Sequence, residues 1–455
     1  MDLVNKHITL VGLGRTSVAL AKLLLAKGAH PLITEVKSRE ACGSLADAAA
    51  SLGVTVEFGG HSEAAFEDAE FIVPSPGVSP DIDVISNAAR RGVSVLGELE
   101  LASRFYAGKV IAVTGTNGKT TTTSLIHAMV TACGHDAVLA GNNDTPFSTV
   151  VMQEPQPEYV VLEVSSYQLE TISTFRPWIG AALNLTNDHL GRHATMENYA
   201  SVKARLFARQ GEGNCALLNE DDPWVCAMPV PEGAHRLGFS MEQPARIEVV
   251  GEEIDIDGKQ IAVLSDIPLK GRHNVLNVLA ALGVIHAGAF DMDAALGGLR
   301  AFHGVEHRIE YVDTVSGVAY YNDSKATNLD SLKVALASFD APVVLIAGGE
   351  GKGSDYTALR SAIEKRVGGL VLIGADAAKM HQAWGELAPV IVAERMEPAV
   401  TAASDLAKKH NLKTVLLSPA CASFDQYANF EARGADFKTC VAKIQTNAAA
   451  LHSTS

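Results

Sequence analysis

The sequence predicts an α/β protein of three domains, and three observations support this. Its 455 residues suit about three domains of roughly 150 residues each. Short apolar runs alternate with amphipathic stretches, which is typical of parallel strands joined by crossover helices. This pattern resets near residues 105 and 300. We therefore expect domains over residues 1–104, 105–304 and 305–455.

The first domain is expected to be Rossmann-like. HITLVGLG (7–14) predicts a strand, followed by a helix through Leu25; HPLITE (30–35), EFIVPSPG (70–77) and SVLGELEL (94–101) predict further strands. The pair Gly12 and Gly14, with Glu35 about twenty residues later, resembles a dinucleotide-binding fingerprint. Ser17 stands where the third glycine would be, so the motif alone is weak support for NAD.

The central domain is expected to hold a mostly parallel sheet with a small β meander. KVIAVTG (109–115), EYVVLEVSS (158–166) and IGAALNLT (179–186) predict strands, and a helix follows the first of them as far as Gly134. Residues 246–270 alternate apolar and polar side chains around an Asp-Gly pair, as a β-hairpin does. Residues 271–288 then predict a helix.

The third domain repeats the alternation of strands and helices. Five apolar strands are expected: VAYYNDS, PVVLIAGG, GLVLIGAD, PVIVAE and KTVLLSPA. Helical stretches separate them, so this domain is also expected to be Rossmann-like.

Composition narrows the functional class. A formal net charge of −15 argues against a nucleic-acid partner, because phosphate neutralisation needs an excess of Lys and Arg. No run of about 18 apolar residues occurs, so no membrane span is expected. The six cysteines form no CxxC pair and suit a reducing compartment. The N-terminal apolar run is short and predicts a strand, not a signal peptide. We therefore expect a cytoplasmic location.

Residues 115–120, GTNGKT, have the sequence context of a phosphate loop. They follow a strand and open a helix, so backbone N–H groups and the helix N-terminus face an anion. Lys119 supplies a charge, and the Thr120 hydroxyl can hold Mg²⁺. Val113 occupies the place of the first glycine in the common pattern, so the loop is two residues shorter. The alternative is an ordinary strand–turn–helix with a chance Gly-Lys pair.

Three more side chains are candidate metal ligands. Glu163 ends a buried strand, where a carboxylate is costly unless it binds a cation. Lys203 shares a helix face with Tyr199 and Leu206, and a buried amine could react with carbon dioxide to give an anionic carbamate. The alternative, which the residues alone favour, is a lysine whose ammonium reaches water. His189, taken alone, suits a surface loop.

The loop TGTNGKTTT resembles that of the Mur ligases and the folylpolyglutamate synthases, which join a carboxylate to an amine using ATP. Four further stretches strengthen the resemblance over nearly the whole chain: LEVSSYQLE (162–170), LNLTNDHLGRH (183–193), NDSKATN (322–328) and SPACASFDQYANFEARG (418–434). The last two resemble the Mur ligases that add D-glutamate. The resemblance implies a monomeric ligase of peptidoglycan precursor synthesis, adding D-glutamate to UDP-N-acetylmuramoyl-L-alanine through an acyl phosphate.

The same resemblance implies roles for individual residues. Lys119, His189 and Lys203 would be catalytic, with His189 a candidate base. ATP would contact Gly115, Thr116, Asn117, Gly118, Lys119, Thr120, Thr121, Asn274, Asn277, Arg308 and Asp323. Two Mg²⁺ ions would be held by Thr120, Glu163, His189 and a carbamylated Lys203. The UDP end of the substrate would contact Arg15, Thr16, Glu35, Lys37, Gly77 and Asn142. D-Glutamate would contact Lys325, Thr327, Lys352, Ser423, Phe424 and Phe430.

The chain departs from the family pattern in two places. Glu35-Val36-Lys37 stands where Asp-Thr-Arg is usual, so a hydroxyl is lost and a lysine cannot make the bidentate contacts of arginine. Asn143 and Asp144 replace residues that are usually apolar or glycine. Three alternatives stay open: a related ligase with another acceptor, a nucleotide-binding protein without turnover, and an NAD-dependent oxidoreductase that would leave the other motifs unused.

Overall fold

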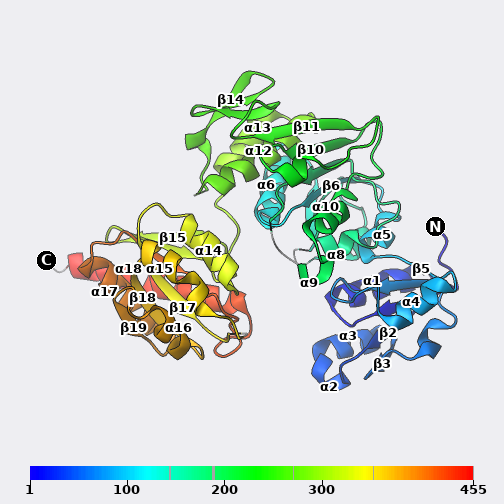
Figure 1. Ribbon diagram of the computed structural model, residues 1–455, viewed down its shortest axis with the longest axis horizontal. Coiled ribbons are helices and arrows are strands. Elements are labelled where there is room, and N and C mark those ends of the chain that lie inside the picture. The colour runs from blue at the N-terminus through cyan, green and yellow to red at the C-terminus, as the bar shows by residue number, and fades with distance from the viewer. Residues whose placement is uncertain (143–144, 187–189, 270, 352, 454–455) are drawn as a thin grey trace. The chain divides into compact units, whose positions relative to one another are not determined.

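The computed structural model describes residues 1–142, 145–186, 190–269, 271–351 and 353–453 (Figure 1). The chain forms two compact units. The first comprises Met1–Ile267 and Val275–Ala301, and the second comprises Pro268–Asn274 and the chain from Phe302 onward. Three sheets run through the described residues, two in the first unit and one in the second. In these ranges no helix is both long and apolar enough to cross a membrane. The predicted α/β class is confirmed.

The N-terminal sheet is parallel, with strand order β3-β2-β1-β4-β5. Its strands are β1 (His7–Val11), β2 (His30–Glu35), β3 (Thr55–Phe58), β4 (Phe71–Pro74) and β5 (Ser94–Val95). Its helices are α1 (Arg15–Ala26), α2 (Arg39–Cys42), α3 (Ser44–Ser51), α4 (Asp83–Arg90) and α5 (Glu98–Ser103). The expected strand over 94–101 is wrong beyond Val95. Gly97 precedes a short helix whose first turn carries Glu98 and Glu100, and acidic residues favour a helix N-terminus.

The central sheet has nine strands in the order β14-β13-β12-β11-β10-β9-β6-β8-β7. They are β6 (Lys109–Thr114), β7 (Ala137–Gly141), β8 (Tyr159–Glu163), β9 (Ile179–Ala182), β10 (Cys215–Asn219), β11 (His235–Ser240), β12 (Ile247–Val250), β13 (Glu253–Ile256) and β14 (Lys259–Val263). Only the pairs β12·β13 and β13·β14 are antiparallel. The expected hairpin is confirmed, and Asp257 and Gly258 turn it with positive φ angles of 54° and 73°.

Helices connect the strands of the central sheet. They are α6 (Lys119–Ala132), α7 (Phe147–Val151), α8 (Ser166–Leu169), α9 (Leu190–His193), α10 (Met196–Ala204), α11 (Pro223–Cys226), α12 (Arg272–Ala287) and α13 (Met292–Arg300). α7 packs on α1 and α5 of the N-terminal sheet, and one hydrophobic core runs through both sheets of this unit. The central strands β6, β8 and β9 are nearly fully buried, so their carboxyl ends form a rigid edge.

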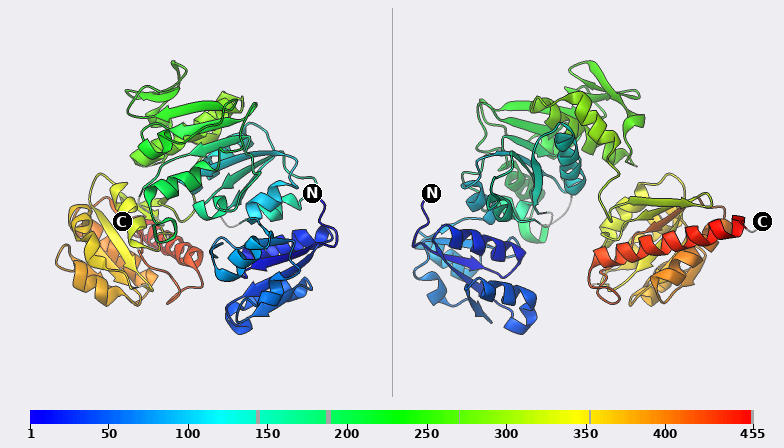
Figure 2. Two further views of the ribbon diagram at one scale, coloured as in Figure 1. Left: turned by 45° about the vertical axis from the view of Figure 1, so that its right-hand side comes forward. Right: turned by 180° about the vertical axis from the view of Figure 1, so that it is seen from behind.

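The second unit contains one sheet of order β15-β16-β20-β17-β18-β19. Its strands are β15 (Glu310–Val315), β16 (Val318–Asn322), β17 (Val343–Gly348), β18 (Val367–Ile373), β19 (Val390–Val392) and β20 (Thr414–Leu417). Its helices are α14 (Leu329–Ala337), α15 (Arg360–Arg366), α16 (Ala377–Trp384), α17 (Met396–Lys409) and α18 (Phe430–Ser453). All five expected strands are confirmed. α14, α15 and α16 bury one face of the sheet; α17 and the long α18 cover the other (Figure 2).

Candidate functional site

The phosphate loop joins β6 to α6 as predicted. Gly118 has a φ of 84° and precedes the first helical residue, Lys119. A Cβ atom on Gly118 would lie 2.3 Å from Oδ1 of Asn277, so no larger residue fits without movement. Lys119 Nζ donates to the carbonyl oxygens of Gly115 (3.0 Å) and Thr116 (2.9 Å). The amine therefore lies over the loop, where a bound phosphate would meet it.

Asn184 fixes the shape of this loop, a role that was not predicted from the sequence. Thr116 N donates to the Asn184 carbonyl (2.8 Å), and Asn117 N donates to Asn184 Oδ1 (2.8 Å). Asn184 Nδ2 donates in return to the Asn117 carbonyl (3.1 Å). A polar residue two positions after the apolar strand β9 was the signal that could have found it.

Glu163 ends β8 and lies level with Val113 of the neighbouring β6. Its side chain is buried. Asn142 Nδ2 donates to Oε1 (2.9 Å), whereas Oε2 has no partner among the described residues. A buried carboxylate oxygen without a partner is costly, and a divalent cation would satisfy it. Thr120 supplies a hydroxyl in the first turn of α6, so these oxygen donors suit Mg²⁺.

Lys203, on α10, is 1% exposed. Its Nζ donates to the Gly115 carbonyl (2.9 Å) and to Thr114 Oγ1 (3.2 Å), and it lies 5.0 Å from the centre of the Tyr199 ring. The interpretation in which the ammonium reaches water is therefore wrong. Tyr199 is fully buried on the same face of α10 as Lys203, as predicted, but the helix ends at Ala204, so the buried Leu206 lies in the turn after it. Lys203 and Lys119 both bond to the Gly115 carbonyl, so the two amines meet at one point of the loop.

Some predicted positions lie outside the described residues. These are His189, the expected metal ligand and base; Lys352, expected near D-glutamate; and Asn143 and Asp144, two of the departures from the family pattern. Their roles stay predictions.

Glu35 binds backbone at the carboxyl edge of the N-terminal sheet. Leu13 N donates to Oε2 (2.7 Å) and Lys37 N to Oε1 (3.0 Å), so this buried carboxylate links the loops after β1 and β2. Ser17, in place of the third glycine, is buried and donates to the Gly12 carbonyl (2.5 Å). The other predicted contacts with the UDP end lie around the same edge: Arg15 and Thr16 begin α1, Lys37 follows β2, and Gly77 follows β4.

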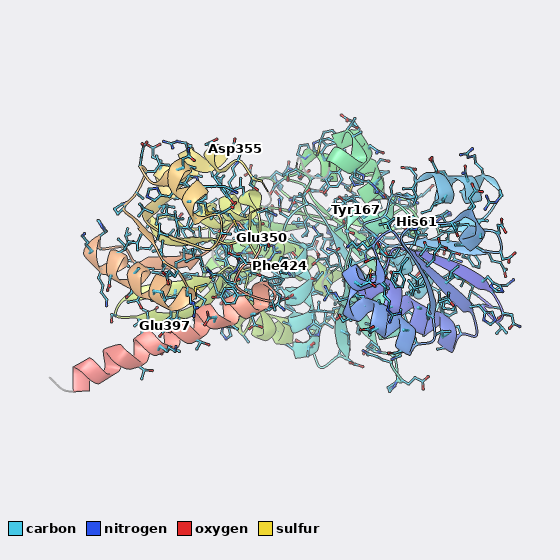
Figure 3. The ribbon with its side chains drawn as sticks, turned by 90° about the horizontal axis from the view of Figure 1, so that it is seen from below. His61, Tyr167, Glu350, Asp355, Glu397 and Phe424 are labelled. Atoms are coloured by element: carbon cyan, nitrogen blue, oxygen red, sulfur yellow. The ribbon has the colours of Figure 1, made fainter. Side chains whose placement is uncertain are left out.

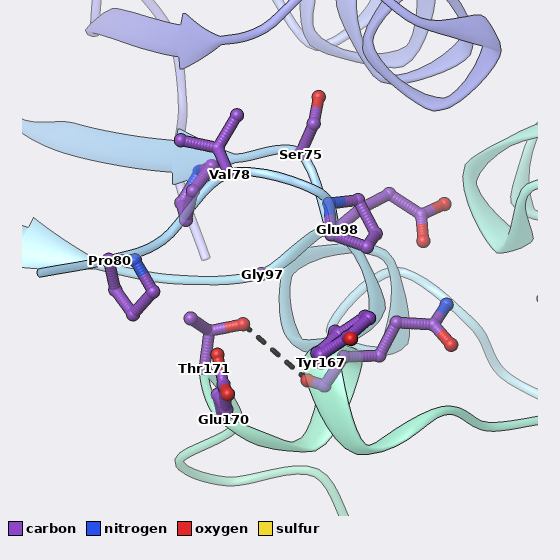
Figure 4. A pocket seen from close by; sticks show the side chains of 11 residues that line it. Ser75, Val78, Pro80, Gly97, Glu98, Tyr167, Glu170 and Thr171 are labelled. Atoms are coloured by element: carbon purple, nitrogen blue, oxygen red, sulfur yellow. Dashed lines mark hydrogen bonds between the residues drawn. The ribbon is translucent and has the colours of Figure 1, made fainter. Parts of the chain in front are cut away.

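A pocket in the first unit lies beside the loop that carries Gly77 (Figure 4). Residues of 74–80, Gly97 and Glu98 line one side, and α8 with the residues up to Thr171 lines the other. Ser148 N donates to Glu98 Oε1 (2.6 Å), and burial raises the pKa of the Glu98 carboxyl. Glu98 was not predicted as a site residue, because it lies within the stretch that was expected to be a strand.

Arg308 and Asp323 lie close together in the second unit. Ile309 N donates to Asp323 Oδ1 (3.2 Å), and Ser418 Oγ donates to Oδ2 (2.7 Å). Burial raises the pKa of the Asp323 carboxyl to about 7, although the Ser418 bond and the Arg308 charge oppose this. Arg308 Nε is buried and has no partner in the described part of the chain, so it can donate a hydrogen bond to a ligand.

The described positions predicted for D-glutamate follow β16 and β20. Lys325 Nζ lies 5.6 Å from the centre of the Phe430 ring, and Thr327 N donates to the Lys325 carbonyl (2.9 Å). Ser423 is buried, whereas Phe424 is 68% exposed. Phe424 lies near Glu350, which pairs with the neighbouring Ala422 (Figure 3). The carboxyl ends of parallel strands thus bring these loops together.

Arg433 joins the same loops, a role that was not predicted from the sequence. Its guanidinium donates to Oγ and the carbonyl of Ser324 (3.0 and 2.9 Å) and to the carbonyls of Cys421 (3.0 Å) and Ala422 (3.2 Å). The side chain is buried, and burial lowers its pKa to about 10. An arginine spaced among apolar residues of a helix was the only signal for it.

Three family models match the chain in order. Residues 6–97 match the Mur ligase MurD-like N-terminal domain, residues 113–285 the Mur ligase middle domain, and residues 307–421 the Mur ligase glutamate ligase domain. Two similar proteins are both named UDP-N-acetylmuramoylalanine--D-glutamate ligase. The one from Geotalea uraniireducens is 40% identical over 98% of this chain and 100% of its own length. The one from Koribacter versatilis is 42% identical over 98% and 99%.

Solved structures share the fold at lower identity. The UDP-N-acetylmuramate-alanine ligase MurC from Thermotoga maritima is 17% identical, has a TM-score of 0.58, and aligns over 97% of this chain and 99% of its own. MurF from Acinetobacter baumannii is 14% identical, with a TM-score of 0.58 over 96% of this chain and 92% of its own.

Proposed function

The chain belongs to the Mur ligase family, and we propose that it is an ATP-dependent ligase that adds D-glutamate to UDP-N-acetylmuramoyl-L-alanine in peptidoglycan precursor synthesis. The observation that supports this chemistry is that Lys119, Lys203 and Glu163 all lie at the carboxyl edge of β6 and β8. Full-length similarity to D-glutamate ligases supports the choice of acceptor.

Each domain takes one substrate in this proposal. Residues 1–104 bind the UDP end through the edge that holds Glu35, Arg15, Thr16, Lys37 and Gly77, with Asn142 contributing from the central sheet. Residues 105–304 bind the phosphates of ATP. Residues 305–455 bind D-glutamate through Lys325, Thr327, Lys352, Ser423, Phe424 and Phe430.

The ATP site is proposed to draw on both units. Gly115 to Thr121 hold the phosphates with backbone N–H groups at the start of α6 and with the Lys119 amine. Asn277 lies against Gly118 of this loop and accepts a hydrogen bond from the Thr122 hydroxyl on α6 (3.2 Å), and Asn274 lies one turn earlier on α12. Arg308 and Asp323 complete the site from the second unit.

The residues present suit two Mg²⁺ ions. Thr120, Glu163, His189 and a carbamylated Lys203 would hold them, and the ions would supply positive charge beside the transferring phosphoryl group. Carbamylation joins the neutral Lys203 nitrogen to the carbon of carbon dioxide, with loss of one amine proton. The burial of Lys203 supports this step, because burial disfavours the charged ammonium.

The reaction has two steps. An oxygen of the L-alanine carboxylate attacks the γ-phosphorus of ATP, and ADP leaves. The D-glutamate amine then attacks the acyl carbon, the bond from carbon to the phosphate oxygen breaks, and inorganic phosphate leaves. A base takes the amine proton, and His189 is the candidate for this role if its ring nitrogen is not bound to Mg²⁺. Because both reactants of the first step are anions, the height of its barrier depends on positioning and on charge neutralisation by Lys119.

We also propose that the protein acts as a cytoplasmic monomer on these small molecules, without nucleic acid or membrane partners.

The test is phosphate release from ATP with UDP-N-acetylmuramoyl-L-alanine and one amino acid at a time. We expect release to require both the nucleotide substrate and D-glutamate, and the product mass to rise by one glutamyl unit. Release with another amino acid would keep the ligase chemistry and overturn the acceptor. No ATP consumption with any acceptor would overturn the ligase assignment.

A further inference from the structure

The loops after β17 and β20 are joined by backbone hydrogen bonds. Glu350 N donates to the Ala422 carbonyl (2.9 Å), and Ala422 N donates to the Glu350 carbonyl (3.1 Å). Gly348 N donates to the Pro419 carbonyl (2.9 Å). Ser423 directly follows this pairing, so its position depends on how the two loops are held.

A buried side-chain group lies beneath both loops. The Tyr356 hydroxyl donates to Asp376 Oδ2 (2.7 Å) and lies 3.1 Å from Sγ of Cys421. Tyr356, Asp376 and Cys421 are 3%, 5% and 1% exposed. The Tyr356 hydroxyl therefore contacts the loop after β20 at Cys421, in a position shielded from solvent.

The other loop touches the same hydroxyl. A Cβ atom on Gly351 would lie 1.8 Å from Asp376 Oδ2 and 2.4 Å from the Tyr356 hydroxyl, so this backbone rests directly on the Tyr–Asp hydrogen bond. Asp376 N also donates to the Gly349 carbonyl (3.0 Å). One tyrosine hydroxyl thus contacts Gly351 on one loop and Cys421 on the other.

We propose that Tyr356, oriented by Asp376, is a positioning residue for the acceptor amino acid. Its hydroxyl sets the distance between the loops over 349–351 and 421–423, and so places Ser423 before the acceptor binds. This inference rests on the proposed function, which assigns these loops to D-glutamate. Without the hydroxyl the loops sample more arrangements, and acceptor binding must then order them.

The ring and the hydroxyl of Tyr356 make separate contacts. The ring packs edge-on against Trp384 at 5.5 Å, and Trp384 Nε1 donates to the Tyr356 carbonyl (2.8 Å). These contacts belong to the core and survive in Tyr356→Phe. That variant therefore removes the proposed contact while the packing stays in place.

The first test is the steady-state kinetics of Tyr356→Phe in the full chain. We expect KM for D-glutamate to rise about 10-fold, which is the scale of one lost hydrogen bond. KM for ATP and for the nucleotide substrate should stay within about two-fold of the parent values, and Tm within a few degrees. Equal changes in all three KM values, or a change in Tm alone, would show a merely structural hydroxyl and overturn the proposal.

Tyr320→Phe is the matched control. It removes another buried tyrosine hydroxyl from the same unit, on the opposite face of the sheet in the core with α17. We expect it to leave KM for D-glutamate unchanged. An equal rise in this control would overturn the special role of Tyr356.

Gly351→Ala tests the contact from the loop side. Alone it should also raise KM for D-glutamate, because the added methyl group meets the Tyr–Asp bond. In the double variant Gly351→Ala/Tyr356→Phe, the rise in KM for D-glutamate should be smaller than the product of the two single rises, since both substitutions disturb one contact. Fully independent effects would overturn the proposal. An inactive parent enzyme would instead mark failure of the proposed function, so the two failures are distinguishable.

Discussion

Asp323 shows how burial sets the titration of a single residue. Its carboxyl has a pKa of about 7 in the folded chain, against an ordinary value of 3.8. Below the lower value it is protonated in both folded and unfolded chains. Between the two values only the unfolded chain is ionised, which favours unfolding. This residue therefore makes the second unit less stable as the pH rises from about 4 to about 7.

Asp323→Asn should remove that dependence. Between pH 5 and pH 8 the parent unit should lose about 2–3 kcal/mol of unfolding free energy more than the variant, at about 1.4 kcal/mol per pKa unit. Trp384 is the only tryptophan of this unit, so its fluorescence in denaturant reports the unit alone once Trp178 and Trp224 are replaced by phenylalanine. Parallel pH profiles for the two proteins would contradict the raised pKa.

The substitution Glu163→Gln should weaken metal binding without lowering the stability of the fold. The variant keeps the shape and the bond from Asn142, and loses the charge of the buried oxygen that has no partner in the described ranges. We expect kcat to fall about 100-fold, the Mg²⁺ concentration for half-maximal rate to rise, and Tm to stay equal or increase. Steady-state phosphate release against Mg²⁺ measures this.

Glu158→Gln is the control for that measurement. This exposed glutamate precedes the other end of β8 and pairs with His135, so its loss should leave the rate within about two-fold. Full activity in Glu163→Gln would rule out a role for this carboxylate in metal binding.

Single residues differ in how far the sequence predicts them. The face shared by Tyr199 and Lys203 follows from helical spacing, and its burial is confirmed; Leu206 is also buried but lies beyond the end of α10. Spacing could not predict the hydrogen-bond partners of the Lys203 amine, because these are Thr114 and Gly115, about 90 residues earlier. Arg433 and Asn184 were missed for a similar reason: Arg433 bonds to Ser324 and Asn184 to Asn117, which lie 109 and 67 residues earlier in the sequence.

At the scale of elements, α5 is held by one carboxylate. The Glu100 side chain is fully buried. It accepts hydrogen bonds from Arg104, from the N–H groups of Ser173, Thr174 and Phe175, and from the Thr174 hydroxyl. Burial alone raises the pKa of Glu100, but these bonds outweigh it and lower the pKa to about 2. The carboxylate thus fixes α5 to residues 173–175 of the central domain.

Glu100→Gln should destabilise the first unit by about 3 kcal/mol at pH 7. A lowered pKa contributes stability that is complete above about 4.5 and lost as the pH falls towards 2. The variant should therefore show a flatter acid denaturation profile over that interval, measured by circular dichroism. Asp47→Asn, which breaks an exposed pair with Arg39, should change stability by less than about 0.5 kcal/mol. Equal effects of the two substitutions would contradict the role of Glu100.

Complete burial favoured the prediction of strands but did not ensure it, because the fully buried β10 was not expected. β17 and β18 are almost fully buried and appear in the sequence as apolar runs. β3 and β15 are mostly half-buried or exposed, so their residues mix polar and apolar types and neither strand was expected. α5 was mistaken for a strand because its alternating Glu and Leu residues match a two-residue period, although burial of the glutamates sets its structure.

At the scale of the whole molecule, the residues proposed for ATP belong to different units. Gly115 to Thr121 lie in the first unit, whereas Arg308 and Asp323 lie in the second. The sequence predicts both sets but carries no information about the distance between them, because no local pattern depends on it. A ligand that contacts both sets must couple the two units, and its binding free energy then favours the arrangements in which both contacts form.

Small-angle scattering measures that coupling. With a non-hydrolysable ATP analogue and Mg²⁺, we expect the radius of gyration to fall and the spread of distances within the molecule to narrow. Arg308→Ala should still bind the analogue through the phosphate loop, at about 10-fold lower affinity, but should lose the compaction. Arg395→Ala, an exposed arginine of the same unit, should behave like the parent. Undiminished compaction in Arg308→Ala would show that the second unit contributes no contact to ATP through this residue.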